Sequence, residues 1–234
     1  MSPAFCVESP SALTRLIASC PGEWRAYTDH AFVQGLGDGT LPEGAFRHYL
    51  VQDYVFLFHF CRAWALAAAK TDNLADMRAC TAVLDGILNT EMDLHVSYCA
   101  DWGIDASALE NSREEAANMA YTRFVLDWGQ RGDLLDLVTA LAPCVFGYQV
   151  IGEKLMDDSA TKKVGNRYMS WIEMYGGEDY AEAISPLDSL LERLVATKLG
   201  PDPEKHPRWP QLARIFADAT RLEAGFWDMG LEGT

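Results

Sequence analysis

The segment between residues 45 and 70 limits what this chain can fold into more than any other feature. It reads AFRHYLVQDYVFLFHFCRAWALAAAK, places apolar residues on nearly every face of a helix, and ends in helix-forming alanines. A helix that is apolar on all sides is enclosed by other parts of the protein, whereas a surface helix keeps one polar face. The sequence therefore predicts one long buried helix here.

Helical periodicity continues along most of the chain, and no alternating strand pattern is longer than four residues. Asn73 is placed to begin a second helix, which Gly103 stops. Ser112 and Glu115 have the spacing of a capping box, in which two side chains bond to the backbone at the start of a helix. We expect this third helix to end at about Gly129.

Asp133 is placed to cap a further helix, which reaches about residue 157 and contains Pro143. Because proline removes a backbone hydrogen bond, we expect a kink just before Cys144. Thr40 or Pro42 would start the long buried helix. The chain is thus expected to form one all-α domain, residues 1–234, of seven or eight helices. The other helices are predicted at about 161–175, 178–198 and 208–229, with loops at 32–44 and 200–210.

The charge of the chain argues against two kinds of partner. It has 34 acidic and 19 basic residues, a net charge of −15, whereas nucleic acids and anionic membranes attract an excess of Lys and Arg. Its apolar fraction of 49% suffices for a large core. Charged residues or His interrupt the apolar stretches before about 18 residues, and the N-terminal residues lack a signal-peptide pattern. We expect no binding to nucleic acid or membrane.

The cysteines show no pattern of a zinc or dithiol site, because none stands in a C-x-x-C pair. Most of them lie in apolar or amphipathic runs, where a free cysteine behaves as a small hydrophobic residue. This usage favours a reducing, cytoplasmic setting. The six are Cys6, Cys20, Cys61, Cys80, Cys99 and Cys144.

Three side chains are candidates for chemistry. Asp53 lies among aromatic and apolar residues, so its carboxyl either forms a helix–helix ion pair or lines a pocket. Cys144 follows the expected kink and shares a helix face with Tyr148; it is either an inert core residue or a nucleophile. Glu223 is either solvated or, beside two aromatic residues, partly desolvated, with a raised pKa that suits proton transfer.

Aromatic side chains are frequent enough to form stacking walls for a flat heteroaromatic ligand, although each one could equally fill a helical core. Those of interest are Tyr49, Tyr54, Phe56, Tyr121, Tyr148, Trp171 and Tyr175.

Glu91 and His95 are four residues apart on one predicted helix. A di-iron helical bundle uses Glu-x-x-His, and uses it twice, so neither the spacing nor the number fits. We expect a hydrogen bond between the two side chains and no metal site. The chain also lacks HExxH, G-x-S-x-G, a P-loop and the dinucleotide-binding G-x-G-x-x-G.

Five segments, in order along the chain, resemble the TenA family, also called thiaminase II or aminopyrimidine aminohydrolase. Together they are distributed over almost the whole sequence, and five ordered matches are far more specific than any one of them. The segments are FVQGLGDGTLPEGAFRHYLVQDYVFL (32–57), EMDLHVSY (91–98), LAPCVFGYQVIGEKL (141–155), YMSWIEMYGGEDY (168–180) and EAGFWDMG (223–230).

The resemblance implies an all-α, haem-oxygenase-like helical bundle that usually assembles as a homotetramer. Family members hydrolyse 4-amino-5-aminomethyl-2-methylpyrimidine to the 5-hydroxymethyl compound in thiamin salvage, and some also hydrolyse thiamin. The implied partner is a small pyrimidine, and no metal or redox cofactor is required.

The resemblance also implies roles for individual residues. Cys144 matches the nucleophile of the cysteine-type branch, Glu223 the proton-exchanging glutamate, and Asp53 the aspartate that holds the amidine edge of the ring. Phe56 stands where the cysteine-type pattern often has Tyr, so stacking is kept and one hydroxyl is lost. The tyrosines expected to line the pocket are Tyr121, Tyr148 and Tyr175.

Two other functions stay open at the level of sequence. One is a haem-oxygenase-like di-iron oxidase, which the Glu91–His95 spacing disfavours. The other is a non-catalytic pyrimidine-binding or regulatory relative, because a fold does not determine a function. The joint presence of Cys144, Glu223 and Asp53 argues against that second function, since a binding protein needs no nucleophile.

Overall fold

The predicted long buried helix is present as α4, Glu43–Ala69, in a computed structural model that describes residues 10–233. Pro42, one of the two predicted starting residues, is its N-cap. Side chains on several faces of α4 are completely buried, among them Phe46, Tyr49 and Ala63. Such a helix needs neighbours all around it, and the other helices provide them.

The described residues contain no β-strand, and they form twelve α-helices with two short turns of other helix types. The N-terminal helices are α1 Ala12–Ser19, α2 Pro21–Thr28 and α3 Ala31–Asp38. After α4 come α5 Leu74–Gly86, the π-helical turn η1 Ile87–Glu91, α6 Met92–Asp101, α7 Ala106–Glu110, α8 Ala116–Arg131 and α9 Leu134–Asp157. The last elements are α10 Met169–Gly176, α11 Glu178–Leu199, the 3-10 turn η2 Pro203–Lys205 and α12 Trp209–Glu232.

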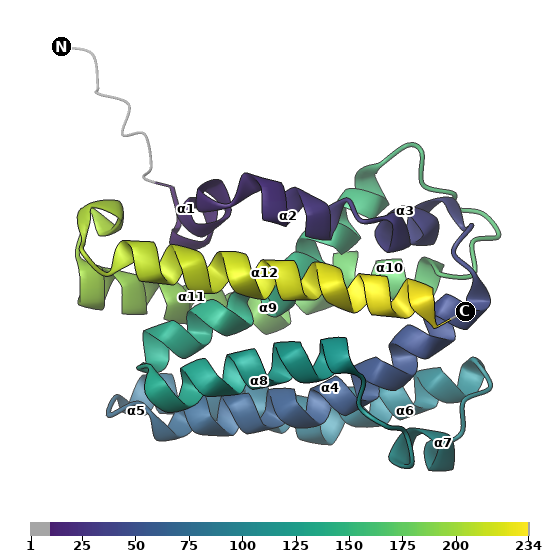
Figure 1. The fold of residues 1–234 in the computed structure, drawn as a ribbon, viewed down its shortest axis with the longest axis horizontal. Helices are drawn as coiled ribbons and strands as arrows, with labels where there is room; N and C mark the ends of the chain where they lie inside the picture. The colour runs from purple at the N-terminus through teal and green to yellow at the C-terminus, as the bar shows by residue number, and fades with distance from the viewer. Residues whose placement is uncertain (1–9, 234) are drawn as a thin grey trace.

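Helix α9 lies at the centre of the bundle, where it packs against α8, α10, α11 and α12. Helix α12 runs lengthwise across the molecule, with α1, α2 and α3 along one side of it and α4 and α8 along the other (Figure 1). Among the described residues, α9 alone is long and apolar enough to cross a membrane, with a mean hydropathy of 1.7. Because 83% of that stretch is buried inside the protein, α9 has the position of a core helix.

Two predicted helix starts are confirmed by their hydrogen bonds. The Asn73 side chain accepts bonds from the backbone N–H groups of the first turn of α5. Asp133 caps α9, and its backbone N–H is bonded in return by the side chain of Asp136, which completes a capping box. The predicted stop at Gly103 is also present, because this residue has a φ of 72° and follows α6 directly.

The predicted loop at 32–44 is wrong for its first half, which forms α3. His30 caps this helix with its ring nitrogen, and glycines inside it allow close packing. A Cβ on Gly35 would lie 3.0 Å from the side chain of Leu41, so the chain turns back against its own helix there. Among the glycines of 32–44, only Gly39 has the left-handed backbone, with a φ of 77°, that the glycine-rich pattern indicated.

The capping box predicted from Ser112 and Glu115 is also wrong. The Ser112 hydroxyl donates to the carbonyl of Leu109, and Glu115 is the N-cap of α8 without a side-chain bond. The Glu115 N–H is bonded instead by the side chain of Gln52 on α4, at 3.1 Å. A tertiary contact has replaced the local one.

The helix predicted at 161–175 begins only at Met169, because the preceding loop is held by tertiary bonds. The buried Asn166 side chain donates to the carbonyls of Leu36 and Gly37 on α3, at 2.8 and 3.1 Å. The helix predicted from Asn73 is divided by the π-helical turn η1. These differences and the short helices α1, α2, α3 and α7 explain why there are more helices than the seven or eight predicted.

The five cysteines within the described residues are free thiols. Residues 1–9 lie outside the described residues. They include Cys6 and the first part of the segment in which a signal peptide was looked for. Four of the five are buried, and only Cys144 is partly accessible. The burial of Cys61, Cys80 and Cys99 agrees with their apolar sequence setting.

The close contact between α9 and α10 leads to a stability prediction. A Cβ on Gly152 would lie 2.5 Å from the carbonyl carbon of Tyr175, so Gly152→Ala must push the two helices apart. We expect a loss of about 1–3 kcal/mol in the free energy of unfolding, measured by chemical denaturation. Gly225→Ala is the control, because nothing lies within 4 Å of its Cβ position. Equal stability of the two variants would contradict this packing.

Candidate active site

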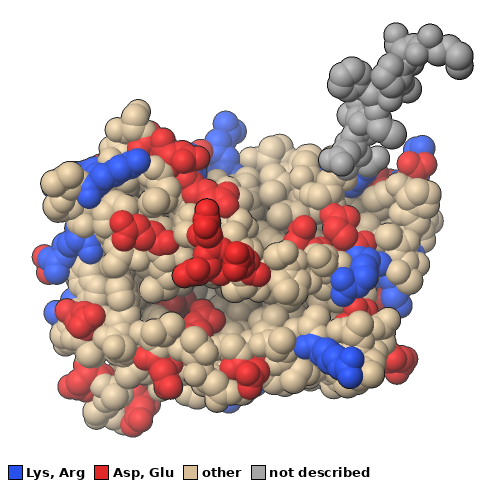
Figure 2. Space-filling model, turned by 180° about the vertical axis from the view of Figure 1, so that it is seen from behind, with Lys and Arg blue, Asp and Glu red and all other residues tan. Residues whose placement is uncertain are grey.

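A cavity of about 860 Å³ lies between α4, α5 and α6 on one side and α9, α10 and α11 on the other. It opens on the face opposite to Figure 1, and Figure 2 shows a hollow near the centre of that face with acidic side chains beside it. Five of the seven residues predicted for the site line this cavity: Asp53, Phe56, Cys144, Tyr148 and Tyr175.

The other two predicted residues, Tyr121 and Glu223, lie behind the cavity wall. Glu223 on α12 is only 2% exposed, and the Tyr121 hydroxyl on α8 donates a 2.8 Å hydrogen bond to its Oε1. The same carboxyl is close enough to the thiol of Cys144 on α9 that each group shifts the pKa of the other. Residues from three helices therefore form one chain of polar contacts, and Cys144 is the member that meets the cavity.

Burial is the largest cause of the pKa shifts of Glu223 and Cys144. It raises the pKa of Glu223 to about 8, against the opposing effect of the Tyr121 hydrogen bond. Burial, followed by the charges of Glu223, Asp53 and Glu91, raises the pKa of the Cys144 thiol well above its ordinary value. At neutral pH the carboxyl of Glu223 and the thiol of Cys144 are therefore both mainly protonated.

Asp53 occupies the opposite part of the cavity wall, on α4. Burial raises its pKa to about 7, and a hydrogen bond with Tyr49 acts in the other direction. Its Oδ2 lies 3.6 Å from Nδ1 of His95, whose own pKa is lowered by burial. Asp53 therefore lines a pocket. It also faces His95 on another helix, but these pKa shifts favour the neutral form of each group over the ion pair.

The predicted hydrogen bond between Glu91 and His95 is wrong. Nε2 of His95 lies 2.9 Å from the carbonyl oxygen of Leu50 on α4, so its bond goes to a different helix. Glu91 and His95 both line the cavity. Among the residues from 10 to 233, no group of three or more His, Cys, Asp or Glu side chains is arranged to hold a metal ion.

Aromatic rings form the remaining wall. The ring of Tyr175 lies 4.8 Å from that of Tyr148 and 4.7 Å from that of Trp171, between centroids. Phe56 stacks on Tyr121 at 5.4 Å with an interplanar angle of 27°. A planar ring could lie against these surfaces. Of the other aromatic candidates, Tyr49 lines the cavity, whereas Tyr54 does not.

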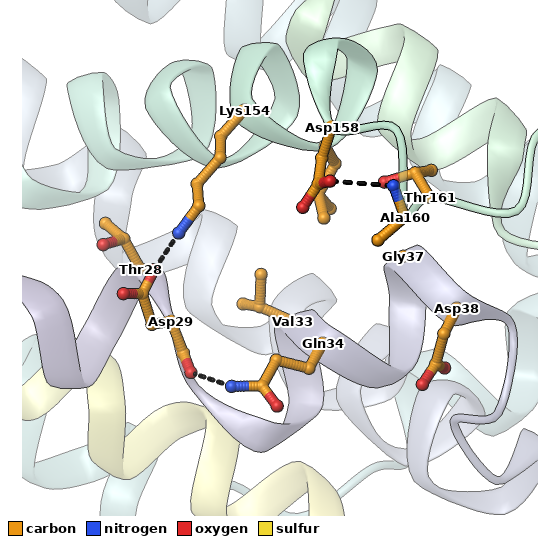
Figure 3. A pocket seen from close by; sticks show the side chains of 11 residues that line it. Thr28, Asp29, Val33, Gln34, Gly37, Asp38, Lys154, Asp158, Ala160 and Thr161 are labelled. Atoms are coloured by element: carbon orange, nitrogen blue, oxygen red, sulfur yellow. Dashed lines mark hydrogen bonds and ion pairs between the residues drawn. The ribbon is translucent and has the colours of Figure 1, made fainter.

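A second cavity of about 390 Å³ lies between α2, α3 and the end of α9. Figure 3 shows its polar groups already bonded to one another: Lys154 pairs with Asp29, and the Gln34 amide donates to the Asp29 carbonyl. None of the residues predicted for the site lines this second cavity. The larger cavity is therefore the candidate active site.

The comparison with known proteins agrees with this geometry. The TENA/THI-4/PQQC family matches residues 18–233. The chain belongs to this family. An aminopyrimidine aminohydrolase of Halalkalibacterium halodurans is 36% identical over 206 residues, which cover 88% of this chain and 89% of that protein.

Solved structures of TenA proteins share the fold. A crystal structure described as a TenA family transcription regulator from Silicibacter sp. TM1040 is 48% identical, with a TM-score of 0.90, over 94% of this chain and 96% of that one. A domain from Shewanella denitrificans described as having a heme oxygenase-like fold is 16% identical, with a TM-score of 0.70 over 96% and 94% of the two chains. The expected haem-oxygenase-like, all-α fold is confirmed.

Sequence reasoning missed several residues of this TenA-family cavity. Tyr180 extends the aromatic wall and donates from its hydroxyl to the Val145 carbonyl at 3.0 Å. The only available signal was its place at the end of the segment 168–180, which resembles the family. Glu91 was expected to bond to His95 and was not predicted for the cavity, although it begins the segment 91–98 that resembles the family. The other missed acidic residues of the lining are Glu173, Glu178 and Asp179.

The raised pKa of Glu223 predicts a pH-dependent effect on stability. The folded protein keeps this proton up to about pH 8, whereas the unfolded chain loses it near the ordinary value of 4.5. Because the folded state then binds more protons, its stability falls as the pH rises between these values. Relative to Glu223→Gln, the wild type should lose up to about 1.4 kcal/mol per pH unit between about pH 5 and 7.5.

Denaturant unfolding at several pH values measures this difference. Glu232→Gln changes an exposed carboxyl on the same helix and should leave the wild-type profile unchanged. Parallel profiles for the wild type and Glu223→Gln would contradict a raised pKa at Glu223.

Proposed function

We propose that this protein hydrolyses thiamin-derived aminopyrimidines in thiamin salvage, with Cys144 as nucleophile. The substrate is 4-amino-5-aminomethyl-2-methylpyrimidine, which reacts with water to give the 5-hydroxymethyl compound and ammonia. One observation carries the proposal: a partly accessible thiol on a cavity wall lies next to a buried carboxyl whose pKa is raised to about 8. The names of relatives such as the Halalkalibacterium aminohydrolase support the same reaction.

The ring is held at its amidine edge by Asp53. When ring nitrogen N3 is protonated, that edge presents two N–H donors, and a carboxylate is an acceptor-only group that can take both bonds. The pKa of about 7 allows Asp53 to ionise when these donors replace water in the buried site. Tyr148 and Tyr175 provide faces against which the pyrimidine lies. This arrangement fixes which ring atom faces the thiol.

The thiol proton moves to ring nitrogen N1 through Glu223, while Sγ of Cys144 forms a bond to C6. This addition ends the aromaticity of the ring, and its electrons then expel the protonated exocyclic amine as ammonia, which takes up the proton that water releases in the next step. Water adds to the remaining methylene, N1 gives its proton back, and the C6–Sγ bond breaks to restore the ring. A carboxyl with a pKa of about 8 suits both proton transfers near neutral pH.

The thiol requires this help because burial disfavours its ionised form. A free thiolate is not formed in advance; the proton leaves as the new bond to carbon forms. Tyr121 holds the Glu223 carboxyl in place through the 2.8 Å hydrogen bond. Phe56 adds a stacking surface without a hydroxyl, so it orients the ring only by contact.

A hydrolysis assay with the aminopyrimidine and thiamin side by side tests this function. We expect release of the hydroxymethyl compound from the aminopyrimidine, and the ratio of the two rates identifies the preferred substrate. The regulator description of the Silicibacter relative supports a second candidate, a pyrimidine-binding protein without catalysis. Tight binding of the pyrimidine without any turnover would favour that second function and contradict hydrolysis.

Two substitutions should separate catalysis from binding. Cys144→Ser keeps the shape of the pocket but replaces the thiol with a hydroxyl that ionises far less readily, so turnover should fall at least about 10³-fold with product binding kept. Asp53→Asn removes the negative charge that stabilises the N3 proton and the two charge-assisted hydrogen bonds, so binding itself should weaken.

Steady-state kinetics and calorimetric titration with the hydroxymethyl product measure the two effects. Near-normal turnover by Cys144→Ser would show that the cysteine is structural, and unchanged product affinity in Asp53→Asn would remove the proposed role of Asp53.

We also propose that the chain acts as a single domain in the cytoplasm and assembles as a homotetramer, as its resemblance to the TenA family implies. Closed symmetric assemblies of this kind bury matching patches on each copy. Sedimentation at micromolar concentration should therefore give four times the mass of the 26.0 kDa chain. A mass of one chain would contradict this prediction.

A further inference from the structure

Glu91 is a carboxyl of the cavity wall for which the proposed reaction has no use. It is the last residue of η1, the π-helical turn between α5 and α6. A π-helical turn contains one residue more than an α-helical turn and changes the direction of the side chains around it, often at functional sites. Here the turn brings Glu91 into the lining of the cavity that also contains Asp53 and Cys144.

The Glu91 carboxyl has no hydrogen-bond or ion-pair partner among residues 10–233. Protein surrounds it on most sides, while the cavity keeps it partly accessible. Burial, and then the charge of Asp53, raises its pKa to about 7, and the nearby His95 acts in the opposite direction. An unpaired, enclosed carboxyl is costly unless a ligand supplies a positive group.

Apart from His95, every charged side chain that lines the cavity is acidic. Within the part of the chain that the structure describes, no Lys or Arg lines it. Figure 2 shows the same imbalance on the surface around the hollow, where red atoms outnumber blue ones. Such a wall disfavours phosphate esters and favours a cation. The acidic residues of the lining are Asp53, Glu91, Glu173, Glu178 and Asp179.

The proposed substrate carries one group that matches this need. Its exocyclic aminomethyl group is an alkyl amine and, like a lysine side chain, is protonated at neutral pH. Asp53 is occupied by the amidine edge, and Glu223 is occupied by the ring proton and Cys144. Glu91 is the remaining enclosed carboxyl, and its charge acts on Cys144 and Tyr175 across the cavity.

We propose that Glu91 is the counter-ion of the protonated aminomethyl group, and thus determines specificity for the amine over the neutral alcohol. This inference rests on the proposed function. It explains how the site distinguishes two molecules that share the same ring, because the hydroxymethyl product has no positive charge at this position. Loss of that charge also favours release of the product once ammonia has formed.

Calorimetric titration with both compounds tests the inference by comparing Glu91 with Glu91→Gln, with Cys144→Ser in both proteins so that the amine is not hydrolysed during the titration. The protein that has Glu91 should bind the aminomethyl compound more tightly than the hydroxymethyl compound. In Glu91→Gln, the dissociation constant for the amine should rise about tenfold, which corresponds to about 1.4 kcal/mol, while that for the alcohol stays within about twofold. The KM for the amine should rise by a similar factor.

Two further variants serve as controls. Asp93→Asn removes the same charge from an exposed position on α6 outside the cavity lining, and should change neither affinity. Glu91→Asp keeps the charge on a shorter side chain and should restore part of the preference for the amine. Glu91→Gln is expected to fold, because it removes an unpaired enclosed carboxyl and breaks no bond that the structure contains.

The outcomes separate this inference from the function on which it rests. If Glu91→Gln weakens the amine and the alcohol equally, or weakens neither, while the wild type hydrolyses the amine, the counter-ion role is wrong and the proposed function stands. If the wild type neither binds nor hydrolyses either compound, the proposed function fails, and this inference fails with it.

Discussion

The burial of Glu223 is the constraint on which the rest of the site depends. A carboxyl that is 2% exposed in a helical core loses most of its hydration, and its pKa rises to about 8 because the charged form is disfavoured. The hydrogen bond from Tyr121 limits this cost and fixes the orientation of the carboxyl. A group that would be fully ionised on the surface can therefore hold and return a proton near neutral pH.

The fold determines where that carboxyl meets the cavity. Helix α12 contributes Glu223, α8 contributes Tyr121, and α9 contributes Cys144 between them and the open space. These three helices pack against one another in the core, so the polar contacts are supported on all sides by apolar side chains. The other wall, from α4 to α6, is different because it leaves Asp53 and Glu91 facing the space that a ligand would fill.

Structural features that depend on nearby residues were predicted well, whereas those that depend on contacts between residues distant in sequence were not. Asn73 and Asp133 cap helices because each bonds to its own first turn, which depends only on nearby residues. Ser112 failed because Gln52, distant in sequence, bonds the start of α8 instead. The same distinction holds at the site. Asp53 and Glu91 both lie in segments that resemble the family, but Glu91 belongs to a π-helical turn that periodicity does not reveal.

A crystal structure of the protein with the hydroxymethyl product bound would test the central claim most directly. The account predicts that the ring lies in the cavity against Tyr148 and Tyr175, with its amidine edge within hydrogen-bond distance of Asp53. It also predicts that C6 is the ring carbon nearest to Sγ of Cys144, with N1 toward Glu223. A ring bound with its amidine edge away from Asp53, or with C6 out of reach of Cys144, would contradict the account.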